Sequence, residues 1–172
     1  MNDPAEMLFD TDRVIVRRLG AADEDAMYSV YSDPIAARWV EDGLPIKREE
    51  CVKWIEVTQS NYEMRGYGMA AVEWKATGKV IGFVGLVHPG RQKEAEVKYS
   101  FLREYWGRGI ATETVRGMLT FGREKMGLSY IMATLSPENV ASQRVLEKAG
   151  LSFEQDRRDE DGEITRVMGG VL

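Results

Sequence analysis

In the segment from Glu104 to Glu113, EYWGRGIATE, one glycine precedes Arg108 and another follows it. Small residues follow and begin a predicted helix. Glycines this close together mark backbone that bends sharply or lies against a ligand. The first N–H groups of a helix have no partner within the helix, and the helix dipole favours an anion there. We therefore expect this loop either to bind a phosphate group or to serve as a plain connection between a strand and a helix.

Two common phosphate-binding motifs fit the loop poorly. A P-loop needs Gly-Lys followed by Ser or Thr, and the loop has no such ending. A dinucleotide fingerprint needs a third glycine, whereas the spacing Gly107-x-Gly109-x-x-Thr112 puts threonine there. The preceding segment also alternates with polar residues, unlike a buried parallel strand. A nicotinamide enzyme is the weakest of the alternatives.

The elements that must position the loop follow from hydrophobic periodicity and turn residues. Residues 1–10 are interpreted as a loose lead-in, and Asp33-Pro34 as the end of the first helix. The order of elements predicts one α+β domain over residues 1–172 with a mixed sheet. Strands are predicted over 13–17, 67–74, 79–87, 94–102, 130–135, 151–157 and 164–171, and helices over 21–32, 47–65, 110–125 and 140–148.

Composition argues against several classes of function. The chain has 172 residues, of which 44% are hydrophobic and 30% charged, and its net charge of −5 opposes broad binding to nucleic acid. Its only histidine is His88 and its only cysteine is Cys51, so we expect no metal site and no histidine-based triad. The sequence has neither a signal-like N-terminus nor an apolar run that could span a membrane, so we expect a cytoplasmic protein.

A resemblance to a known family favours the phosphate hypothesis. Gly109-Ile110-Ala111 resembles the Gly-x-Gly/Ala part of the acetyl-coenzyme A motif of the GCN5-related N-acetyltransferase (GNAT) superfamily, although Trp106 stands where Gln or Arg is usual. "YWGRGIATE" is similar to the branch of the ribosomal-protein N-terminal acetyltransferases, the RimJ/RimL type. Residues 137–154, PENVASQRVLEKAGLSFE, resemble the Asn-x-x-Ser helix of that family. The resemblance follows the element order over residues 11–168 and is sharp over 95–112 and 137–153.

The resemblance implies a fold and a site for acetyl-CoA as cosubstrate. In this family a twisted, mostly antiparallel sheet of six or seven strands, flanked by about four helices, splays between strands four and five. Those strands correspond here to residues 94–102 and 129–135. The backbone of the first of these strands would hold the pantetheine arm, and the glycine loop would hold the pyrophosphate. The implied coenzyme-binding residues are Phe101, Leu102, Arg103, Trp106, Gly107, Arg108, Gly109, Ile110, Ala111, Thr112, Asn139, Ser142 and Arg144.

The resemblance also implies direct attack of an amine on the thioester. The ammonium form cannot attack, and Glu96, on the polar face of its strand, is the expected base; a solvated strand glutamate is the alternative. Ser142 resembles the serine proposed to protonate the leaving thiol, and a packing role is its alternative. Many relatives use a tyrosine for this purpose where the chain has Leu146. Tyr99 is expected mainly to pack in the core.

The acceptor and the assembly stay open at this level. The acceptor can be a protein N-terminus or a small-molecule amine, and the protein a monomer or a homodimer. A non-catalytic acyl-CoA-binding sensor or interaction module is the alternative function. The tryptophans Trp39, Trp54 and Trp74 are expected in the core or in the acceptor groove. The acidic residues of the last hairpin either form a solvated turn or attract a cationic amine; they are Asp156, Asp159, Glu160, Asp161 and Glu163.

Overall fold

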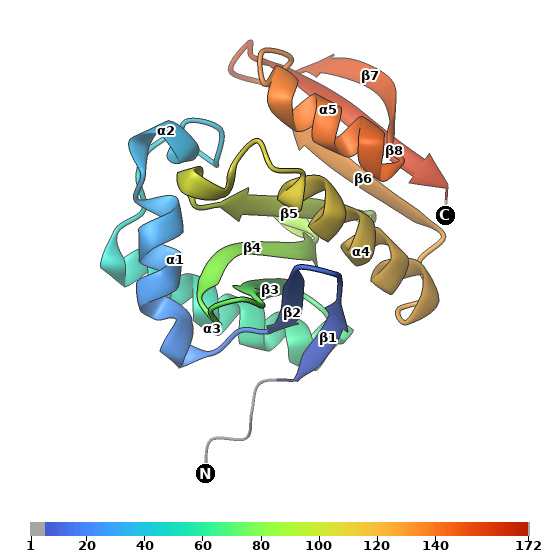
Figure 1. Cartoon of the computed structure of the whole chain (residues 1–172). Coiled ribbons are helices and arrows are strands. Elements are labelled where there is room, and N and C mark those ends of the chain that lie inside the picture. Colours follow the sequence, from blue (N-terminus) through green and yellow to red (C-terminus); the bar gives the residue numbers. More distant parts are fainter. Residues whose placement is uncertain (1–5, 172) are drawn as a thin grey trace.

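The computed structural model describes residues 6–171, which form an eight-stranded sheet in the order β1-β2-β3-β4-β5-β6-β8-β7 (Figure 1). The helices are α1 (Glu24–Tyr31), α2 (Pro34–Ala37), α3 (Arg48–Arg65), α4 (Ile110–Glu124) and α5 (Val140–Ala149). The strands are β1 (Met7–Asp10), β2 (Val14–Arg18), β3 (Met69–Trp74), β4 (Val80–Val87), β5 (Ala95–Phe101), β6 (Tyr130–Leu135), β7 (Ser152–Arg158) and β8 (Ile164–Val171).

The sheet opens between β5 and β6. Every other pair of neighbouring strands is antiparallel, whereas β5 and β6 are parallel and pair only at Ala95 with Ile131 and at Glu96 with Met132. Beyond these two pairs β6 continues along β8, and β5 continues along β4. Figure 1 shows β6, β7, β8 and α5 as a group turned away from the end of β5. The strands therefore part at the C-terminal half of β5, as the resemblance implied.

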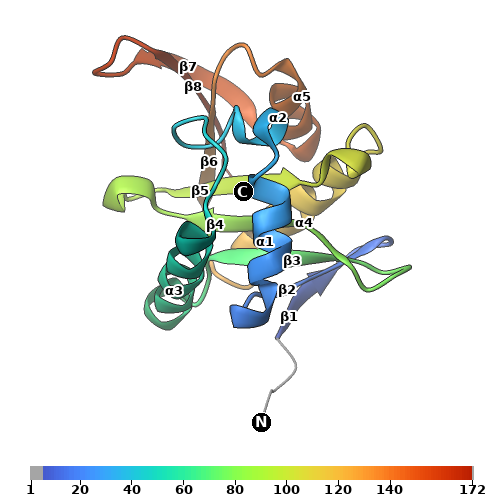
Figure 2. The same cartoon turned by 90° about the vertical axis from the view of Figure 1, so that its left-hand side faces the viewer.

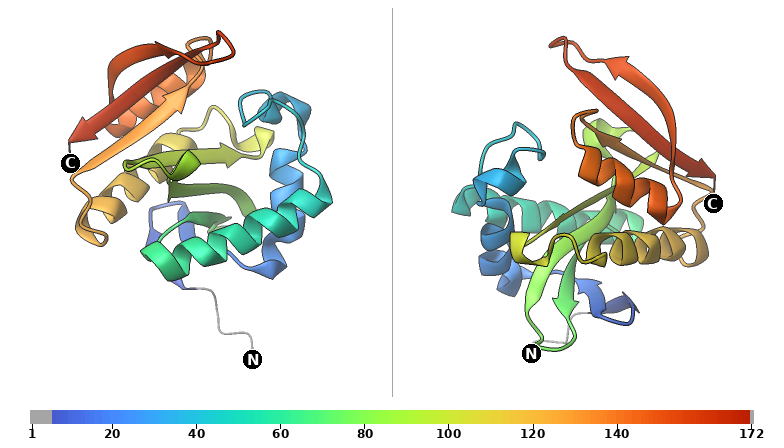
Figure 3. Two further views of the ribbon diagram at one scale, coloured as in Figure 1. Left: turned by 180° about the vertical axis from the view of Figure 1, so that it is seen from behind. Right: turned by 45° about the horizontal axis from the view of Figure 1, so that its top comes forward.

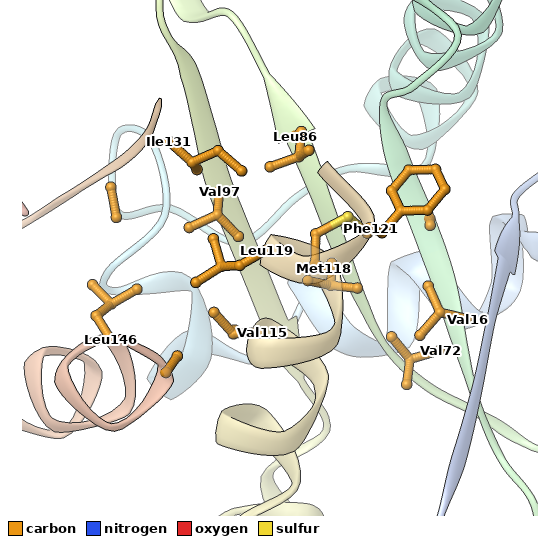
Figure 4. Packing of buried hydrophobic residues seen from close by; sticks show 14 of the residues in the cluster. Val16, Val72, Leu86, Val97, Val115, Met118, Leu119, Phe121, Ile131 and Leu146 are labelled. Carbon is orange, nitrogen blue, oxygen red and sulfur yellow. The ribbon is translucent and has the colours of Figure 1, made fainter. Parts of the chain in front are cut away.

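Helix α4 fixes the position of the glycine loop because it packs closely on one face of the sheet. Val115, Met118 and Leu119 recur at the spacing of one helix face and pack against buried residues of the central strands (Figure 4). At Gly122 an added Cβ would lie 2.8 Å from Cδ1 of Ile131. The side chains of Ile131 and Leu86 would have to shift to admit a larger residue, so α4 lies close against the sheet at this point.

The other face of the sheet carries α1 and α3. A second core cluster joins Val30 of α1, Cys51 and Ile55 of α3, and Phe83 of β4. Figure 2 shows α1 and α3 next to each other on this face, and Figure 3 shows α3 running across the sheet from behind. The loop between α2 and α3 lies on the same side as the opening of the sheet.

Most of the predicted elements are confirmed to within two residues, including β6 and β8 at both ends. The first helix is divided into a 3-10 turn, Ala21–Asp23, and α1. Two elements were missed, so the sheet has eight strands and five helices flank it. The lead-in is wrong for Met7–Asp10, which form β1, and Met1–Ala5 lie outside the described residues.

Helix α2 was missed because Asp33-Pro34 was interpreted only as a stop signal. Oδ1 of Asp33 accepts a hydrogen bond from the N–H of Ile35 at 3.0 Å, so Asp33 caps a new helix. Pro34 occupies the first helical position, where its missing N–H costs nothing. The same dipeptide therefore ends α1 and begins α2.

Candidate functional site

The glycine loop exposes a row of backbone amides at the start of α4. Gly107 and Gly109 have φ angles of 74° and 77°, in the left-handed region that favours glycine. Among the described residues, the N–H groups from Gly107 through Thr112 have no hydrogen-bond partner; the first to bond is that of Glu113, to the carbonyl of Gly109 at 3.0 Å. Six unpaired donors at the positive end of a helix dipole form a strong site for an anion.

A long-range ion pair braces this loop. The guanidinium of Arg13 donates from Nε to Oε1 of Glu113 at 2.9 Å and from Nη1 to the carbonyl of Arg108 at 3.0 Å. The hydroxyl of Thr11 donates to Glu113 at 2.5 Å. Burial raises the pKa of Glu113, but the hydrogen bonds from Thr11 and Arg13 lower it more, so the pKa lies below its usual 4.5. The charged carboxylate thus ties the first turn of α4 to the segment before β2.

A cavity of about 1260 Å³ joins the loop to the opening of the sheet. Ten of the sequence-predicted coenzyme residues line it, and they come from β5, the glycine loop, α4, and α5 with its N-cap. They are Phe101, Trp106, Gly107, Gly109, Ile110, Ala111, Thr112, Asn139, Ser142 and Arg144. Four other predicted residues, Glu96, Leu102, Arg103 and Arg108, are not among the residues that line it. The structure therefore brings the two sequence motifs together around one space.

The alternating direction of the N–H groups along β5 determines which of its backbone groups face the opening. The N–H of Leu102 donates to the carbonyl of Ile81 at 2.8 Å, so it is engaged with the β4 side and is not free for a ligand. Because donors alternate between the two edges of a strand, the N–H groups of Tyr99 and Phe101 point the other way, where β6 no longer pairs. The indole of Trp106 donates to the carbonyl of Phe101 at 2.9 Å and folds over the strand end.

The side chains of Arg103 and Arg108 have other partners. Arg103 forms a bidentate ion pair with Asp33, at 2.9 and 3.0 Å, which joins the end of β5 to the start of α2. The guanidinium of Arg108 lies 5.3 Å from the ring centroid of Tyr105. Both side chains are largely exposed. Neither residue is among those that line the cavity.

The N-terminus of α5 carries the second motif. Oδ1 of Asn139 accepts a hydrogen bond from the N–H of Ser142 at 3.2 Å, which makes Asn139 the cap of this helix. The cap orients Asn139 and Ser142 towards the cavity, which both of them line. Arg144 is exposed at the same end of the cavity and makes no ion pair within residues 6–171.

Ser142 has an unforeseen partner. The hydroxyls of Tyr99 and Ser142 lie 2.6 Å apart, and both residues line the cavity. Burial raises the pKa of Tyr99 to about 12, so its phenol stays neutral at physiological pH. The expectation that Tyr99 mainly packs in the core is therefore incomplete, since its hydroxyl reaches the opening. Leu146, one turn beyond Ser142, is buried in the core cluster against which Tyr99 packs.

Glu96 does not lie on an accessible polar face, so that part of the prediction is wrong, and the solvated alternative is wrong as well. Its exposure is 2%, because β6 pairs with β5 at this residue and covers it. The hydroxyl of Thr134 donates to Glu96, and Nζ of Lys98 lies 3.7 Å from its carboxylate. Thr134 and Lys98 line the cavity. Glu96 therefore reaches the cavity only through these two neighbours.

The acidic hairpin between β7 and β8 does not line the cavity. Asp156 pairs with Arg166 at 2.8 Å, and Asp159 with Arg157 at 3.3 Å, so two of its five acids are neutralised locally. Of the tryptophans, Trp39 and Trp54 line the cavity, whereas the ring centroid of Trp74 lies 5.5 Å from that of Tyr105 beside the core.

Within residues 6–171, no cluster of three or more His, Cys, Asp or Glu side chains is arranged to hold a metal ion. The same part of the chain has no helix with the length and apolar character needed to cross a membrane.

Comparison with known proteins identifies the family. The model of the acetyltransferase (GNAT) domain matches residues 13–152. The chain belongs to the GNAT acetyltransferase family. It is therefore an acyltransferase of the acetyl-CoA-dependent class.

Two proteins of Bacillus subtilis (strain 168) are similar along most of their length. YkkB, an uncharacterized protein, is 30% identical over 151 residues, which is 86% of this chain and 87% of YkkB. YoaA, named as an uncharacterized N-acetyltransferase, is 28% identical over 149 residues, which is 86% of this chain and 84% of YoaA.

Solved structures share the GNAT fold. An acetyltransferase from Agrobacterium tumefaciens C58 superimposes with a TM-score of 0.82 at 23% identity, covering 100% of this chain and 96% of that one. RimL, the ribosomal L7/L12 alpha-N-protein acetyltransferase solved in complex with coenzyme A, superimposes with a TM-score of 0.83 at 14% identity, covering 97% of this chain and 98% of RimL. At these identities the likeness concerns the fold alone.

Proposed function

We propose that this protein transfers the acetyl group of acetyl-CoA to a primary amine, by direct attack while both substrates are bound. One observation carries the proposal: six unpaired amides at the start of α4, the unpaired edge of β5 and the Tyr99–Ser142 pair all meet at one cavity. Acetyl-CoA would supply the activated thioester carbonyl. The protein's own groups hold that carbonyl and move the protons.

The anion site and the strand edge suit the two parts of the coenzyme. The amides from Gly107 to Thr112 would bind the pyrophosphate, and Arg144 a further phosphate. The N–H groups of Tyr99 and Phe101 would bind the pantetheine arm in the manner of an added strand. A backbone N–H that also holds the oxyanion of the transition state contributes about 3–4 kcal/mol where such donors have been removed. Asn139, beside this path, would contact the pantetheine.

Two proton routes lead from the cavity: one through the Thr134 hydroxyl to the buried Glu96, and one through the Ser142 hydroxyl to that of Tyr99. The Glu96 carboxylate accepts from Thr134, and the Thr134 oxygen can in turn accept a proton from the amine or a water in the cavity. We therefore keep Glu96 as the proposed base, acting through Thr134. Ser142 would donate to the leaving thiolate and recover its proton from Tyr99. The phenol missing at Leu146 is thereby supplied from β5.

The non-catalytic alternative was suggested by the leucine at position 146, and the Tyr99 hydroxyl beside Ser142 supports turnover because it can take the place of the missing phenol. A free-thiol assay with acetyl-CoA over a panel of primary amines and N-terminal peptides tests the choice. We expect thiol release that depends on the acceptor, together with a calorimetric signal for coenzyme A binding. Binding of coenzyme A without turnover of any acceptor would instead favour a sensor. The absence of binding would refute both.

A further inference from the structure

Helix α3 presents an apolar stripe, made of Trp54, Val57 and Met64, to the cavity. Trp54, Val57, Asn61 and Met64 recur at spacings of three and four residues, and all four line the cavity. Val57 is 52% exposed and Met64 72% exposed. Cys51 and Ile55 of the same helix are buried in the second core cluster, and Trp54 packs against that cluster at the inner end of the stripe. Side chains of this kind gain nothing from facing water, so the stripe is suited to contact an apolar part of a ligand.

Aromatic rings form the inner end of the same wall. The ring centroids of Tyr31 and Trp54 lie 5.3 Å apart at 75°, and those of Tyr31 and Phe83 lie 6.0 Å apart. Met27 and Met69 line the cavity beside them. Flexible thioethers against fixed rings adapt well to a flat or branched apolar group. This wall lies on the α1 and α3 side of the cavity, away from the helix N-terminus that suits the coenzyme phosphates.

Positive charge dominates the acceptor side. Lys53, Arg65 and Arg91 line the cavity, and none of them forms an ion pair or a side-chain hydrogen bond within residues 6–171. Among the lining residues only Glu41 carries a carboxylate. Such a lining repels polycations and attracts a carboxylate.

We propose that the acceptor is a small amino-acid-like molecule: a primary amine that also bears a carboxylate and an aromatic or branched apolar group. This inference rests on the proposed acetyl transfer. The apolar group would lie on the α3 stripe, and the carboxylate would face Lys53, Arg65 or Arg91. Because amine, carboxylate and apolar group must share one cavity with the thioester, a compact free molecule fits these features better than a polypeptide N-terminus, whose carboxylate is distant.

A matched panel of acceptors tests the class. We expect kcat/KM for phenylalanine to exceed that for phenethylamine, which lacks the carboxylate, and that for alanine, which lacks the ring, by about tenfold each. The kcat/KM values for spermidine and for the dipeptide Phe-Ala amide should be lower still. Equal or better turnover of spermidine, or of the dipeptide amide, would overturn the inference while leaving acetyl transfer intact.

Variants locate the two contacts. Val57→Ser and Met64→Ser should each raise KM for phenylalanine about fivefold, because each removes apolar area from the contact. Val52→Ser is the matched control, since Val52 is 45% exposed on the same helix but does not line the cavity. Arg65→Gln should reduce the preference for phenylalanine over phenethylamine, and Lys93→Gln, outside the cavity, should not.

A binding measurement separates this inference from the proposed function. Trp39 and Trp54 line the cavity, so phenylalanine should change the tryptophan fluorescence of the protein saturated with coenzyme A, whether or not turnover occurs. A change with phenylalanine but not with alanine or spermidine supports the acceptor class. A change with spermidine alone refutes the class. If acetyl-CoA neither binds nor is consumed with any acceptor, the proposed function fails, and the acceptor inference fails with it.

Discussion

Replacing Tyr99 by Phe removes one oxygen atom from the proposed proton path and keeps the ring that packs under it. The hydroxyl of Tyr99 lies 2.6 Å from that of Ser142, and we expect it to restore the proton that Ser142 gives to the leaving thiolate. The loss of one such hydrogen bond costs about 1 kcal/mol of stability, so the variant should fold. Any large change in rate then reflects chemistry.

The size of the effect depends on pH. General acid catalysis contributes about 10²–10⁴-fold, and because Ser142 remains we expect a loss near the lower end, about 100-fold in kcat at neutral pH. An ordinary thiol has a pKa near ~8.5, so above about pH 9.5 the thiolate leaves without a proton. The pKa of Tyr99 is raised to about 12, so the wild-type phenol is still neutral there. The defect of Tyr99→Phe should therefore shrink to less than about threefold at about pH 10.

Single-turnover release of free thiol at saturating acetyl-CoA measures this defect across the pH range. Ser142→Ala and the double variant complete a thermodynamic cycle, and a shared path predicts that the double variant is little worse than either single one. A loss for Tyr99→Phe that is the same at neutral and at alkaline pH would refute the acid role, as would strictly additive losses in the cycle.

Three further predictions concern groups outside this pair. Glu113→Gln should raise KM for acetyl-CoA about fivefold at unchanged kcat. The pKa of Glu113 is lowered in the folded state, so the ionised carboxylate stabilises the fold above pH 4.5, and this stabilisation is lost as the pH falls through the lowered pKa. The melting temperatures of the wild type and of Glu113→Gln should therefore converge in acid. A difference in melting temperature that stays constant with pH would contradict this role of Glu113. Glu96→Gln should reduce kcat by about 100-fold and leave the affinity for coenzyme A unchanged, whereas the matched control Glu94→Gln should leave kcat unchanged. Equal kcat values for the wild type and both variants would show that Glu96 is not the base. Leu146→Ala should lower the free energy of unfolding by about 3 kcal/mol in urea titration, because Leu146 is 1% exposed, and a loss below about 1 kcal/mol would show that the site collapses around the smaller residue.

The parts of the site that lie within one short segment could be predicted from the sequence. Gly107 and Gly109 mark a helix N-terminus by residue type alone, and the alternation of residues 94–102 marks the strand before it. The cap at Asn139 follows from the same local rules. Since each of these signals is read within about ten residues, no tertiary contact was needed to find them.

The parts that depend on distant pairs could not be predicted. Arg13 and Glu113 are 100 residues apart in the chain, and Tyr99 and Ser142 are 43 apart. Glu96 was predicted to lie on an accessible polar face because strand alternation cannot show that β6 covers it. Which hydroxyls reach the cavity depends on where β5 and β6 part, and the pairing between these strands joins segments that are far apart in the chain.

The most direct test is mass spectrometry of a primary-amine acceptor incubated with acetyl-CoA and the protein. We expect the acceptor to gain one acetyl group in step with the release of one free thiol, at a rate reduced by Tyr99→Phe. Thiol release without acetylation of the acceptor, or an acceptor that stays unmodified while coenzyme A binds normally, would contradict acetyl transfer to an amine.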